Sequence, residues 1–392
     1  MTNQSDFSTR IHAVDALRGF AIVSIMLLHN LEHFDVYFLP PNLPDWMVQL
    51  DKKIWDTSFF LFAGKSYAIF ALLFGLTFFI QTNNQEKKGK DFRLIFAWRL
   101  VLLLVFGFIN SAFYQGDILT IYAALGFFII PFSKMNNKAI FIISLLLLAQ
   151  PIELANLYSA IQNPNLEIAN PKSWTYFGKM DSYIKADSFI DTVYGNLTNG
   201  KLAVLQWSHE NGRYAHILAL FLLGMLGGRV GIFSPSKKNR KIWLKCLLLS
   251  FLAFVILYYV QKNILPEIDS KIINRSITII EKSWTNIAFM LVLVSSFLLL
   301  FQSKIGAKIL HYLSPIGKMS LSNYIIQSIL GSSIYYGFGL GLYKYTGATY
   351  SMLLSIVLAI IMGIFSTWWM HKNKRGPLET LWHKATWAFS RK

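Results

Sequence analysis

Residues 15–33 read DALRGFAIVSIMLLHNLEH, an apolar run with a charged start and a polar end. A helix needs about 20 predominantly apolar residues to cross the hydrocarbon core of a bilayer. Similar apolar blocks recur along the chain, and they do not alternate with polar residues as half-buried strands do. The sequence therefore predicts an all-α, polytopic membrane helix bundle of about ten transmembrane helices. The expected spans are 17–31, 57–80, 94–113, 118–132, 139–154, 214–230, 242–260, 284–301, 319–338 and 350–370.

The composition indicates the same class. Of the 392 residues, 54% are apolar, 16% are aromatic and only 15% are charged, whereas an ordinary soluble domain has roughly 25% charged residues. No hydrophilic segment is long enough for a separate soluble domain of about 100 residues. We therefore expect residues 1–392 to form a single membrane domain. The single cysteine, Cys246, excludes an internal disulfide.

The basic residues lie in short clusters beside the apolar blocks, so the net charge of +17 indicates topology and not a face for nucleic acid. With the N-terminus inside, the internal segments hold most of the Lys and Arg and few of the Asp and Glu. These segments are 1–18, 82–99, 133–138, 229–245, 302–318 and 371–392. The positive-inside rule then places both termini in the cytoplasm. We expect a multi-pass protein of the bacterial cytoplasmic (inner) membrane that is surrounded by lipids. The sequence leaves the oligomeric state open, and a homodimer is one alternative.

The longest external segment covers residues 152–213. It is polar and rich in aromatic residues, with Asn-Pro at 163–164 and 170–171, and these dipeptides favour turns. Two interpretations stay open, a cap over the external face and a solvated linker between two five-helix halves.

The first span carries the densest set of polar residues, and polar groups inside a span are candidates for a functional site. Arg18 and His29 are 11 residues apart, so they share a helix face and lie about 16 Å apart along its axis. Asn30 and Glu32 follow directly. With Arg18 at the cytoplasmic boundary and His29 in the outer half, this spacing suits an enzyme with an anionic donor inside and an acceptor outside. The alternative is that Arg18 contacts lipid phosphate and His29 bonds a neighbouring helix.

The run from His29 to His33 also matches the H-x-x-E-H pattern of inverted zinc peptidases. Histidines at i and i+4 share a helix face and can bind one metal ion. A third ligand, such as Glu210, has to be assumed, because five residues are a weak motif. We expect no metal.

Two charged residues stand at other spans. Lys65 lies inside the second span and Asp117 begins the fourth on the external side. A lysine inside a span needs a carboxylate or a wet cavity, so the two side chains are candidates to pair. The pair is either part of a site or a structural ion pair.

Two further groups are candidates for substrate binding. One precedes the sixth span on the outer side, and it consists of Trp207, His209, Glu210 and Arg213. The other falls at helical spacing in the ninth span, where Asn323, Tyr324 and Gln327 are candidates either for a site or for hydrogen bonds between helices.

Several motifs, in order along the chain, resemble those of the YeiB-like family of uncharacterised bacterial membrane proteins (domain of unknown function 418). They are Asp15-Ala16-Leu17-Arg18-Gly19-Phe20-Ala21, Gly64-Lys65 with Leu73-Phe74-Gly75, Gly116-Asp117-Ile118-Leu119 with Tyr122-Ala123, Gly317-Lys318-Met319-Ser320-Leu321-Ser322-Asn323-Tyr324 with Gln327, Tyr336-Gly337-Phe338-Gly339-Leu340-Gly341, and Gly376-Pro377-Leu378-Glu379 with Trp382. Each motif is weak by itself, and together they are specific and cover nearly the whole chain.

That family is similar to the transmembrane acyltransferases, including the heparan-glucosaminide N-acetyltransferase and the acyltransferase-three proteins. These enzymes use cytoplasmic acyl-CoA to acylate glycans on the far side of the membrane. Their first helix carries Arg-Gly and then a polar residue 11 positions after the arginine. Many YeiB-like proteins have Asn there, whereas this chain has His29, as the acyltransferase-three pattern does, followed by Asn30.

The resemblance implies an acyl-CoA-dependent O- or N-acyltransferase with acetyl-CoA as the expected donor and an extracytoplasmic glycan or other small acceptor. His29 would be the general base, and Arg18 and Arg99 would hold the CoA phosphates. Glu32 or Glu210 would orient the imidazole, and Lys65 or Asn30 would stabilise the oxyanion.

Two alternatives stay open. The first is a transporter or an exporter of lipids or metabolites, in which Lys65 and Asp117 serve a substrate or proton pathway. The second is a zinc-dependent hydrolase built on the histidines of the first span.

Overall fold

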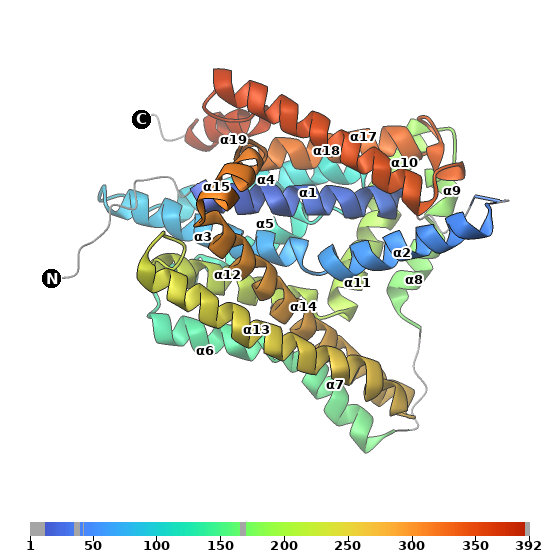
Figure 1. The fold of residues 1–392 in the computed structure, drawn as a ribbon, viewed down its shortest axis with the longest axis horizontal. Coiled ribbons are helices and arrows are strands. Elements are labelled where there is room, and N and C mark those ends of the chain that lie inside the picture. Colours follow the sequence, from blue (N-terminus) through green and yellow to red (C-terminus); the bar gives the residue numbers. More distant parts are fainter. Residues whose placement is uncertain (1–11, 35–39, 42, 165–169, 389–392) are drawn as a thin grey trace.

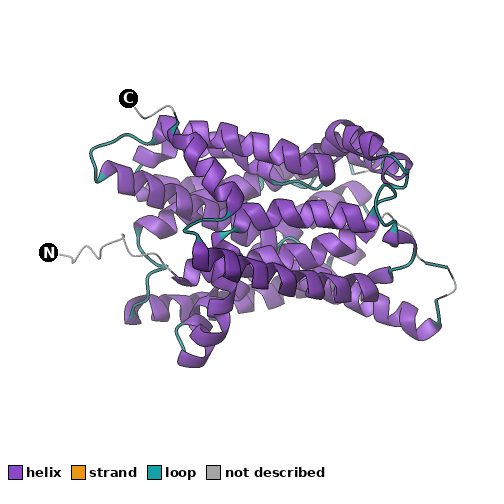
Figure 2. Ribbon diagram, turned by 90° about the horizontal axis from the view of Figure 1, so that it is seen from above, coloured by secondary structure: helices purple, strands orange, loops and turns teal. Residues whose placement is uncertain are grey.

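The apolar blocks of the sequence form helices that run along a common direction (Figure 1). The computed structural model describes residues 12–34, 40–41, 43–164 and 170–388. Within these residues there are helices and no strand, as Figure 2 shows, and the all-α prediction is confirmed. The start of α1 and the whole of α19 lie at one end of the bundle, which we call the α19 end (Figure 1). Helices α8 to α11 lie at the opposite end, the α11 end.

The principal helices are α1 (His12–Phe34), α2 (Asp45–Phe62), α3 (Ser66–Glu86), α4 (Arg93–Phe113), α5 (Leu119–Ile129), α6 (Asn137–Leu148), α7 (Pro151–Gln162), α8 (Lys172–Gly178), α9 (Asp181–Ile184), α10 (Phe189–Gly195), α11 (Lys201–Glu210), α12 (Arg213–Arg229), α13 (Lys237–Asn263), α14 (Lys271–Phe301), α15 (Lys304–Leu310), α16 (Ser314–Lys318), α17 (Ser320–Tyr335), α18 (Gly347–Lys372) and α19 (Pro377–Trp387).

Six helical segments of the described residues are long and apolar enough to cross a membrane, or seven if the bent pair α6–α7 is one span. The protein is therefore a multi-pass membrane protein. Four of the ten expected spans form shorter or bent helices, namely α5, α6–α7, α12 and α17. The core of α12 is almost fully buried by other helices, so much of its surface contacts protein and not lipid.

The expected span 57–80 is not one continuous helix, because α2 ends at Phe62 and α3 begins at Ser66. Gly64 at the break has φ +79°, a left-handed conformation that glycine adopts without strain. A Cβ at Gly64 would also lie 2.5 Å from the side chain of Asn286. The break leaves Lys65 at the start of α3.

The expected span 139–154 bends by 41° between α6 and α7. Gln150 has φ 56° and Pro151 comes directly after it. A proline disfavours the α conformation of the residue before it, so the apolar block is divided at this point.

Two glycines bring α3 and α12 into backbone contact. A Cβ at Gly75 would lie 1.8 Å from the carbonyl oxygen of Phe221, and one at Gly224 would lie 1.8 Å from that of Leu72. The close approach stacks the ring of Phe74 on that of Phe221, with centroids 4.5 Å apart. Phe74 faces the cavity described below, so this contact fixes one wall of the candidate site.

Residues 152–213 were left open between a cap and a linker. The part of them that follows residue 170 folds into the short helices α8 to α11 at the α11 end (Figure 1). It is bound to the bundle, since Gly337 N–H donates to the Ile184 carbonyl at 2.9 Å and Asn196 Nδ2 donates to the Ala112 carbonyl at 3.1 Å. These two hydrogen bonds attach the segment to α4 and to the residue that follows α17 and Tyr336.

Candidate functional site

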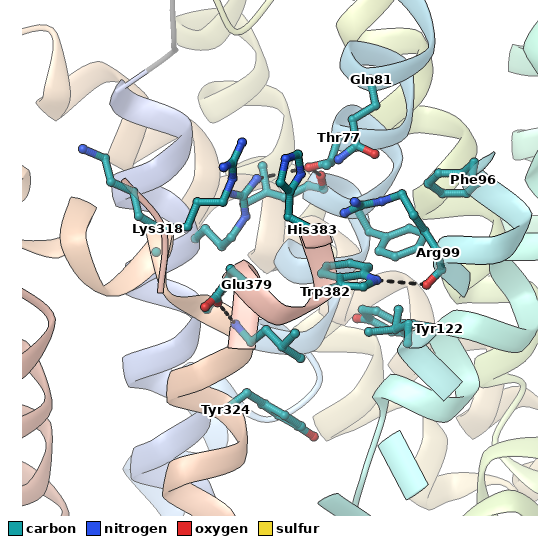
Figure 3. A pocket seen from close by; sticks show the side chains of 18 of the residues that line it. Thr77, Gln81, Phe96, Arg99, Tyr122, Lys318, Tyr324, Glu379, Trp382 and His383 are labelled. Atoms are coloured by element: carbon teal, nitrogen blue, oxygen red, sulfur yellow. Dashed lines mark hydrogen bonds between the residues drawn. The ribbon is translucent and has the colours of Figure 1, made fainter. Parts of the chain in front are cut away.

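A cavity of about 860 Å³ lies between α1, α3, α4, α17 and α19, on the side of the bundle where α19 lies (Figure 3). Its deep wall is aromatic and includes Phe74, Tyr122 and Tyr324. The volume lies in the range of about 300–1,000 Å³ that is typical of small-molecule and cofactor sites. Its basic lining residues are Arg18, Arg99, Lys318, Lys374 and Arg375.

Arg18 and Arg99, both predicted as donor-binding residues, lie at this cavity. Arg18 is half-buried, and its guanidinium donates to Thr77 Oγ1 at 3.1 Å and pairs with Asp15 at 3.3 Å. The guanidinium of Arg99 lies 4.1 Å from the ring centroid of Trp382, a cation–π arrangement that holds it in one direction. The cavity thus presents fixed positive charges that suit an anionic ligand.

Helix α19 forms part of the cavity wall because Glu379 binds it to the start of α17. The Glu379 carboxylate accepts hydrogen bonds from the N–H of Leu321 at 2.7 Å and from Ser322 Oγ at 2.6 Å. In return, Leu378 N–H donates to Ser322 Oγ at 3.0 Å. A carboxylate at a helix N-terminus satisfies N–H groups that have no partner within the helix. Burial raises the pKa of Glu379, and the hydrogen bonds from Ser322 partly oppose this shift.

His29 lies beside two tyrosines. Its ring centroid is 4.4 Å from that of Tyr114 and 5.9 Å from that of Tyr324. Tyr114 donates its hydroxyl to the predicted site residue Glu32. Since Tyr324 also lines the cavity, His29 lies next to the deep end of the cavity.

Asn30 is 2% exposed, and its Nδ2 donates to the Met26 carbonyl of the preceding turn at 2.9 Å. Its Oδ1 has no hydrogen-bond partner among the described residues. The Asn30 amide is therefore held by its own helix, next to His29, and its Oδ1 is a buried acceptor without a partner among the described residues.

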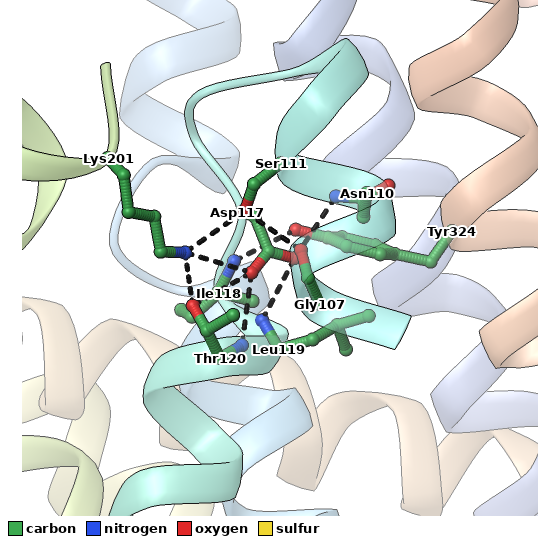
Figure 4. A network of polar contacts seen from close by, with 9 residues as sticks. All are labelled: Gly107, Asn110, Ser111, Asp117, Ile118, Leu119, Thr120, Lys201 and Tyr324. Carbon is green, nitrogen blue, oxygen red and sulfur yellow. Dashed lines mark hydrogen bonds and ion pairs between the residues drawn. The ribbon is translucent and has the colours of Figure 1, made fainter. Parts of the chain in front are cut away.

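Asp117 is fully buried, and its partner is Lys201 (Figure 4). The Lys201 Nζ lies 3.3 Å from Asp117 Oδ2. The predicted partner, Lys65, instead lies with its Nζ 5.9 and 5.7 Å from the ring centroids of Phe60 and Phe289. The pairing of Lys65 with Asp117 is wrong because the break after α2 turns Lys65 toward α14.

The outer group does not form one cluster. Glu210 caps α8, since it accepts from Lys172 N–H at 2.8 Å and from Ser173 Oγ at 2.6 Å. Partial burial alone would raise the pKa of Glu210, but the hydrogen bonds, that of Ser173 first, hold it below the ordinary value. Exposed His209 lies with its ring 6.4 Å from that of Tyr214. The carboxylate of Glu210 is thus engaged with α8.

Trp207 and Arg213 lie closer to the bundle interior. The Arg213 guanidinium is 4.7 Å from the Trp207 ring and 3.8 Å from the Tyr67 ring. The Tyr67 hydroxyl is 2.9 Å from Nδ1 of His216, and Tyr67 accepts the Tyr122 hydroxyl at its carbonyl. Trp207 and Glu210 also line a second cavity of about 430 Å³ at the α11 end.

The three predicted residues of α17 have different roles. Asn323 Nδ2 donates to the Ile316 carbonyl at 3.1 Å and to Ser366 Oγ at 3.0 Å, so it joins three helices. Tyr324 lines the cavity. Gln327 is 3% exposed, and neither its Nε2 nor its Oε1 has a hydrogen-bond partner among the described residues. A buried amide without partners is costly, so Gln327 is a candidate to bind a ligand.

The zinc hypothesis depends on His33, whose side chain lies outside the described part of the chain. Among the residues that the structure describes, no group of three His, Cys, Asp or Glu side chains is placed to hold a metal ion.

The sequence interpretation missed Lys201, Trp382 and Glu379 as parts of the site. Trp382 and Glu379 stood in the last of the family-like motifs, which was the available signal. No sequence signal identified Lys201. In the structure it comes directly after a π-helical turn (Asn196–Gly200). Such turns are rare and occur frequently at functional sites.

The two parts of the chain match two family models. Residues 10–185 match the catalytic region of heparan-alpha-glucosaminide N-acetyltransferase, and residues 227–389 match the protein family of unknown function DUF418. The first match includes Arg18, His29 and Asp117, and the second includes Tyr324 and Glu379. No solved structure matches the chain significantly.

The curated relatives span nearly the full length of the chain and are themselves uncharacterized. Protein YxaH of Bacillus subtilis is 27% identical over 96% of this chain and 94% of its own length. A protein from the amylase 3′ region of Bacillus acidopullulyticus is 25% identical over 96% and 94%. Protein YeiB of Escherichia coli is 24% identical over 95% of each chain. These matches confirm the resemblance that the motifs predict: the chain is similar to the YeiB-like proteins and the DUF418 family, and to the group of heparan-alpha-glucosaminide N-acetyltransferase.

Proposed function

We propose that the protein is a membrane-embedded acyltransferase that moves an acyl group, expected to be acetyl, from cytoplasmic acyl-CoA to an extracytoplasmic glycan or other small acceptor. The observation that carries the proposal is the cavity of about 860 Å³, basic at its α19 end and aromatic at its deep end. Its deep wall reaches Tyr324, whose ring is 5.9 Å from that of His29.

The cavity fits the chemistry of the donor. Coenzyme A carries phosphates at one end and a thioester at the other, joined by a long flexible arm. Arg18, Arg99 and Lys318 supply charges for the phosphates. The aromatic residues farther in would surround the arm and bring the thioester carbonyl to the region of His29.

The transfer itself needs a base and no redox step. His29 would take the proton from an acceptor hydroxyl or amine, and the acceptor atom would attack the thioester carbonyl carbon. The carbon–sulfur bond then breaks, and the CoA thiolate leaves as the new ester or amide bond is completed. The proton held by His29 is available to the departing thiolate, so the enzyme returns to its starting state.

The proposal includes an orientation. The α19 end would face the cytoplasm and the α11 end the outside, with about ten crossings and both termini inside. The positive charge of the loops at the α19 end supports this arrangement. Donor and acceptor would then approach His29 from opposite sides of the membrane.

The test is acyl transfer by the purified full chain in nanodiscs, with labelled acetyl-CoA as donor and glucosamine as an acceptor probe that offers both an amine and hydroxyls. We expect labelled product from the wild type and a loss of about 100-fold or more for His29→Ala, the usual contribution of a general base. The matched control is His371→Ala, since His371 is exposed near the end of α18 and does not line the cavity. Equal labelling by wild type and His29→Ala would show that the assignment of His29 is wrong.

A second candidate is a transporter without chemistry. The break between α2 and α3 favours it, because broken helices at membrane depth are typical of transporter binding sites. The buried Asp117–Lys201 pair is a second supporting feature. Movement of labelled glucosamine into proteoliposomes in the absence of any acyl donor would favour this function over the first.

A further inference from the structure

A buried ion pair joins the α11 end to the turn between α4 and α5 (Figure 4). Asp117 is 0% exposed and Lys201 is 6% exposed. Lys201 Nζ also donates to Ser111 Oγ at 3.1 Å and to Thr120 Oγ1. A buried ion pair is weak evidence for stability, because removing two charges from water offsets most of their attraction. The pair is therefore more informative about the position of the α4–α5 turn, which it contacts, than about stability.

Asp117 holds the first turn of α5. Its two oxygens accept hydrogen bonds from Asn110 Nδ2 at 3.1 Å, from Leu119 N–H at 3.2 Å and from Thr120 N–H at 3.0 Å. Gly107 of α4 allows the close approach, since a Cβ there would lie 2.6 Å from Thr120 Cγ2. Hydrogen bonds from Asp117 and close packing against Gly107 therefore both hold this turn in position.

One N–H of the turn has a different partner. Ile118 N–H donates to the hydroxyl oxygen of Tyr324 at 3.2 Å (Figure 4). Tyr324 lines the large cavity, and its ring is 5.9 Å from that of His29. The turn that Asp117 caps therefore fixes the hydroxyl of a side chain that lines the cavity and whose ring lies beside His29.

Lys201, which pairs with Asp117, directly follows the π-helical turn that precedes α11. This turn, Asn196–Gly200, is tied to α4 through Asn196 and the Ala112 carbonyl. A Cβ at Gly200 would lie 2.8 Å from the Cβ of Gln115, so the segment lies against the same loop. Such turns are rare and occur frequently at functional sites, and Lys201, the residue directly after this turn, is buried in the bundle.

We propose that Lys201 and Asp117 are positioning residues for acyl transfer, which together hold the α5 turn so that Ile118 N–H fixes the Tyr324 hydroxyl beside His29. This inference rests on the proposed function. It adds that α11 is connected, through Lys201, Asp117 and the α5 turn, to the side chains beside His29.

The test compares kinetics and amide exchange in the full chain in nanodiscs. Lys201→Met should lower kcat by about 10- to 100-fold, since a misplacement of about 1 Å at a site costs on the order of 100-fold. The KM for acetyl-CoA should change by less than about twofold, because the basic residues of the cavity are untouched. Lys201→Arg, which keeps the charge, should recover part of kcat.

The matched control is Lys185→Met. Lys185 pairs with Asp181 in the same segment, but that pair lies at the surface. The control should leave kcat and the exchange of residues 114–124 unchanged, whereas Lys201→Met should speed that exchange. If Lys201→Met is too unstable to purify, Asp117→Asn combined with Lys201→Met removes both charges and is measured instead.

A double-mutant cycle separates positioning from general stability. Tyr324→Phe removes the acceptor of the Ile118 bond, so adding it to Lys201→Met should cause little further loss of kcat if both act through that bond. If the kcat losses of the two single variants multiply in the double variant, the inference is wrong. It is also wrong if Lys201→Met is as active as an active wild type. Either result leaves the proposed function unaffected. If the wild type transfers no acyl group, the proposed function fails. Unchanged exchange of residues 114–124 in Lys201→Met would then overturn the structural connection as well.

Discussion

The indole of Trp382 covers the guanidinium of Arg99, with 4.1 Å between the guanidinium carbon and the ring centroid. The same indole donates its Nε1–H to the Arg99 carbonyl at 3.1 Å. Thr386 Oγ1 accepts a further bond from the guanidinium at 3.2 Å. A side chain on α19 thus fixes a cation on α4 at the cavity.

This arrangement predicts that Arg99 contributes to donor binding. Arg99→Lys keeps the charge but loses the planar fork, so we expect the Kd for acetyl-CoA to rise by about tenfold, or about 1.4 kcal/mol. Trp382→Phe keeps a ring and loses the Nε1 bond, so it should weaken binding less. Isothermal titration with acetyl-CoA measures both, and Arg93→Lys is the control because Arg93 pairs with Asp91 at the surface. Unchanged affinity in Arg99→Lys would remove Arg99 from the donor site.

Gln327 and Asn323 give opposite predictions for stability. Gln327→Met replaces a buried amide without partners, so it should leave thermal stability unchanged or raise it by about 1 kcal/mol. Asn323→Leu breaks bonds to α16 and α18 and should cost about 1–3 kcal/mol. Thermal melting in nanodiscs compares the two variants.

The same Gln327→Met variant should lower acyl transfer if the amide binds a reactant. A variant that is both stable and fully active would show that Gln327 has no role in the reaction. We make no such prediction of lower transfer for Asn323→Leu, because the Asn323 amide already bonds to the Ile316 carbonyl and to Ser366.

Glu379 predicts a pH dependence of stability. Burial raises its pKa in the folded protein above the value in the unfolded chain, so the folded state holds this proton more tightly. Stability should therefore fall as the pH rises from the unfolded value, about 4.3, through the raised folded value. Glu379→Gln should lack this dependence. Melting of both proteins between about pH 4 and 8 gives the difference, and parallel curves would contradict the prediction.

The contact of α3 with α12 predicts a severe effect of a single methyl group. Gly224→Ala would place a Cβ against the Leu72 backbone, and overpacking of this kind typically costs about 1–3 kcal/mol. Gly178→Ala is the control, because no atom of the described residues lies within 4 Å of a Cβ there. The melting temperature should fall for the first variant only.

Local parts of the site could be predicted from the sequence. Arg18 and His29 lie on one helix, so the 3.6-residue period is enough to relate them. The apolar blocks likewise located the helices, since burial in lipid requires continuous apolar residues. The break at Gly64 was not predicted, since residues 57–80 were expected to form one continuous span.

Contacts between distant segments could not be predicted in the same way. Lys201 and Asp117 are 84 residues apart, and Lys65 was an equally reasonable partner until the break before α3 was known. The C-terminal segment appeared as a basic internal segment with a family-like motif, and neither feature shows that α19 packs against α4. Both depend on tertiary packing, which no local period encodes.

Helix α19 contributes Glu379 and Trp382 to the cavity, and it is the last helix that the structure describes. Translation delivers it after all the spans, so a nascent chain has the aromatic floor of the cavity before it has this wall. This cavity is therefore completed only after α19 has been synthesised and has packed against α4 and α17. A chain that ends before residue 377 would therefore lack the cavity wall that Glu379 and Trp382 form.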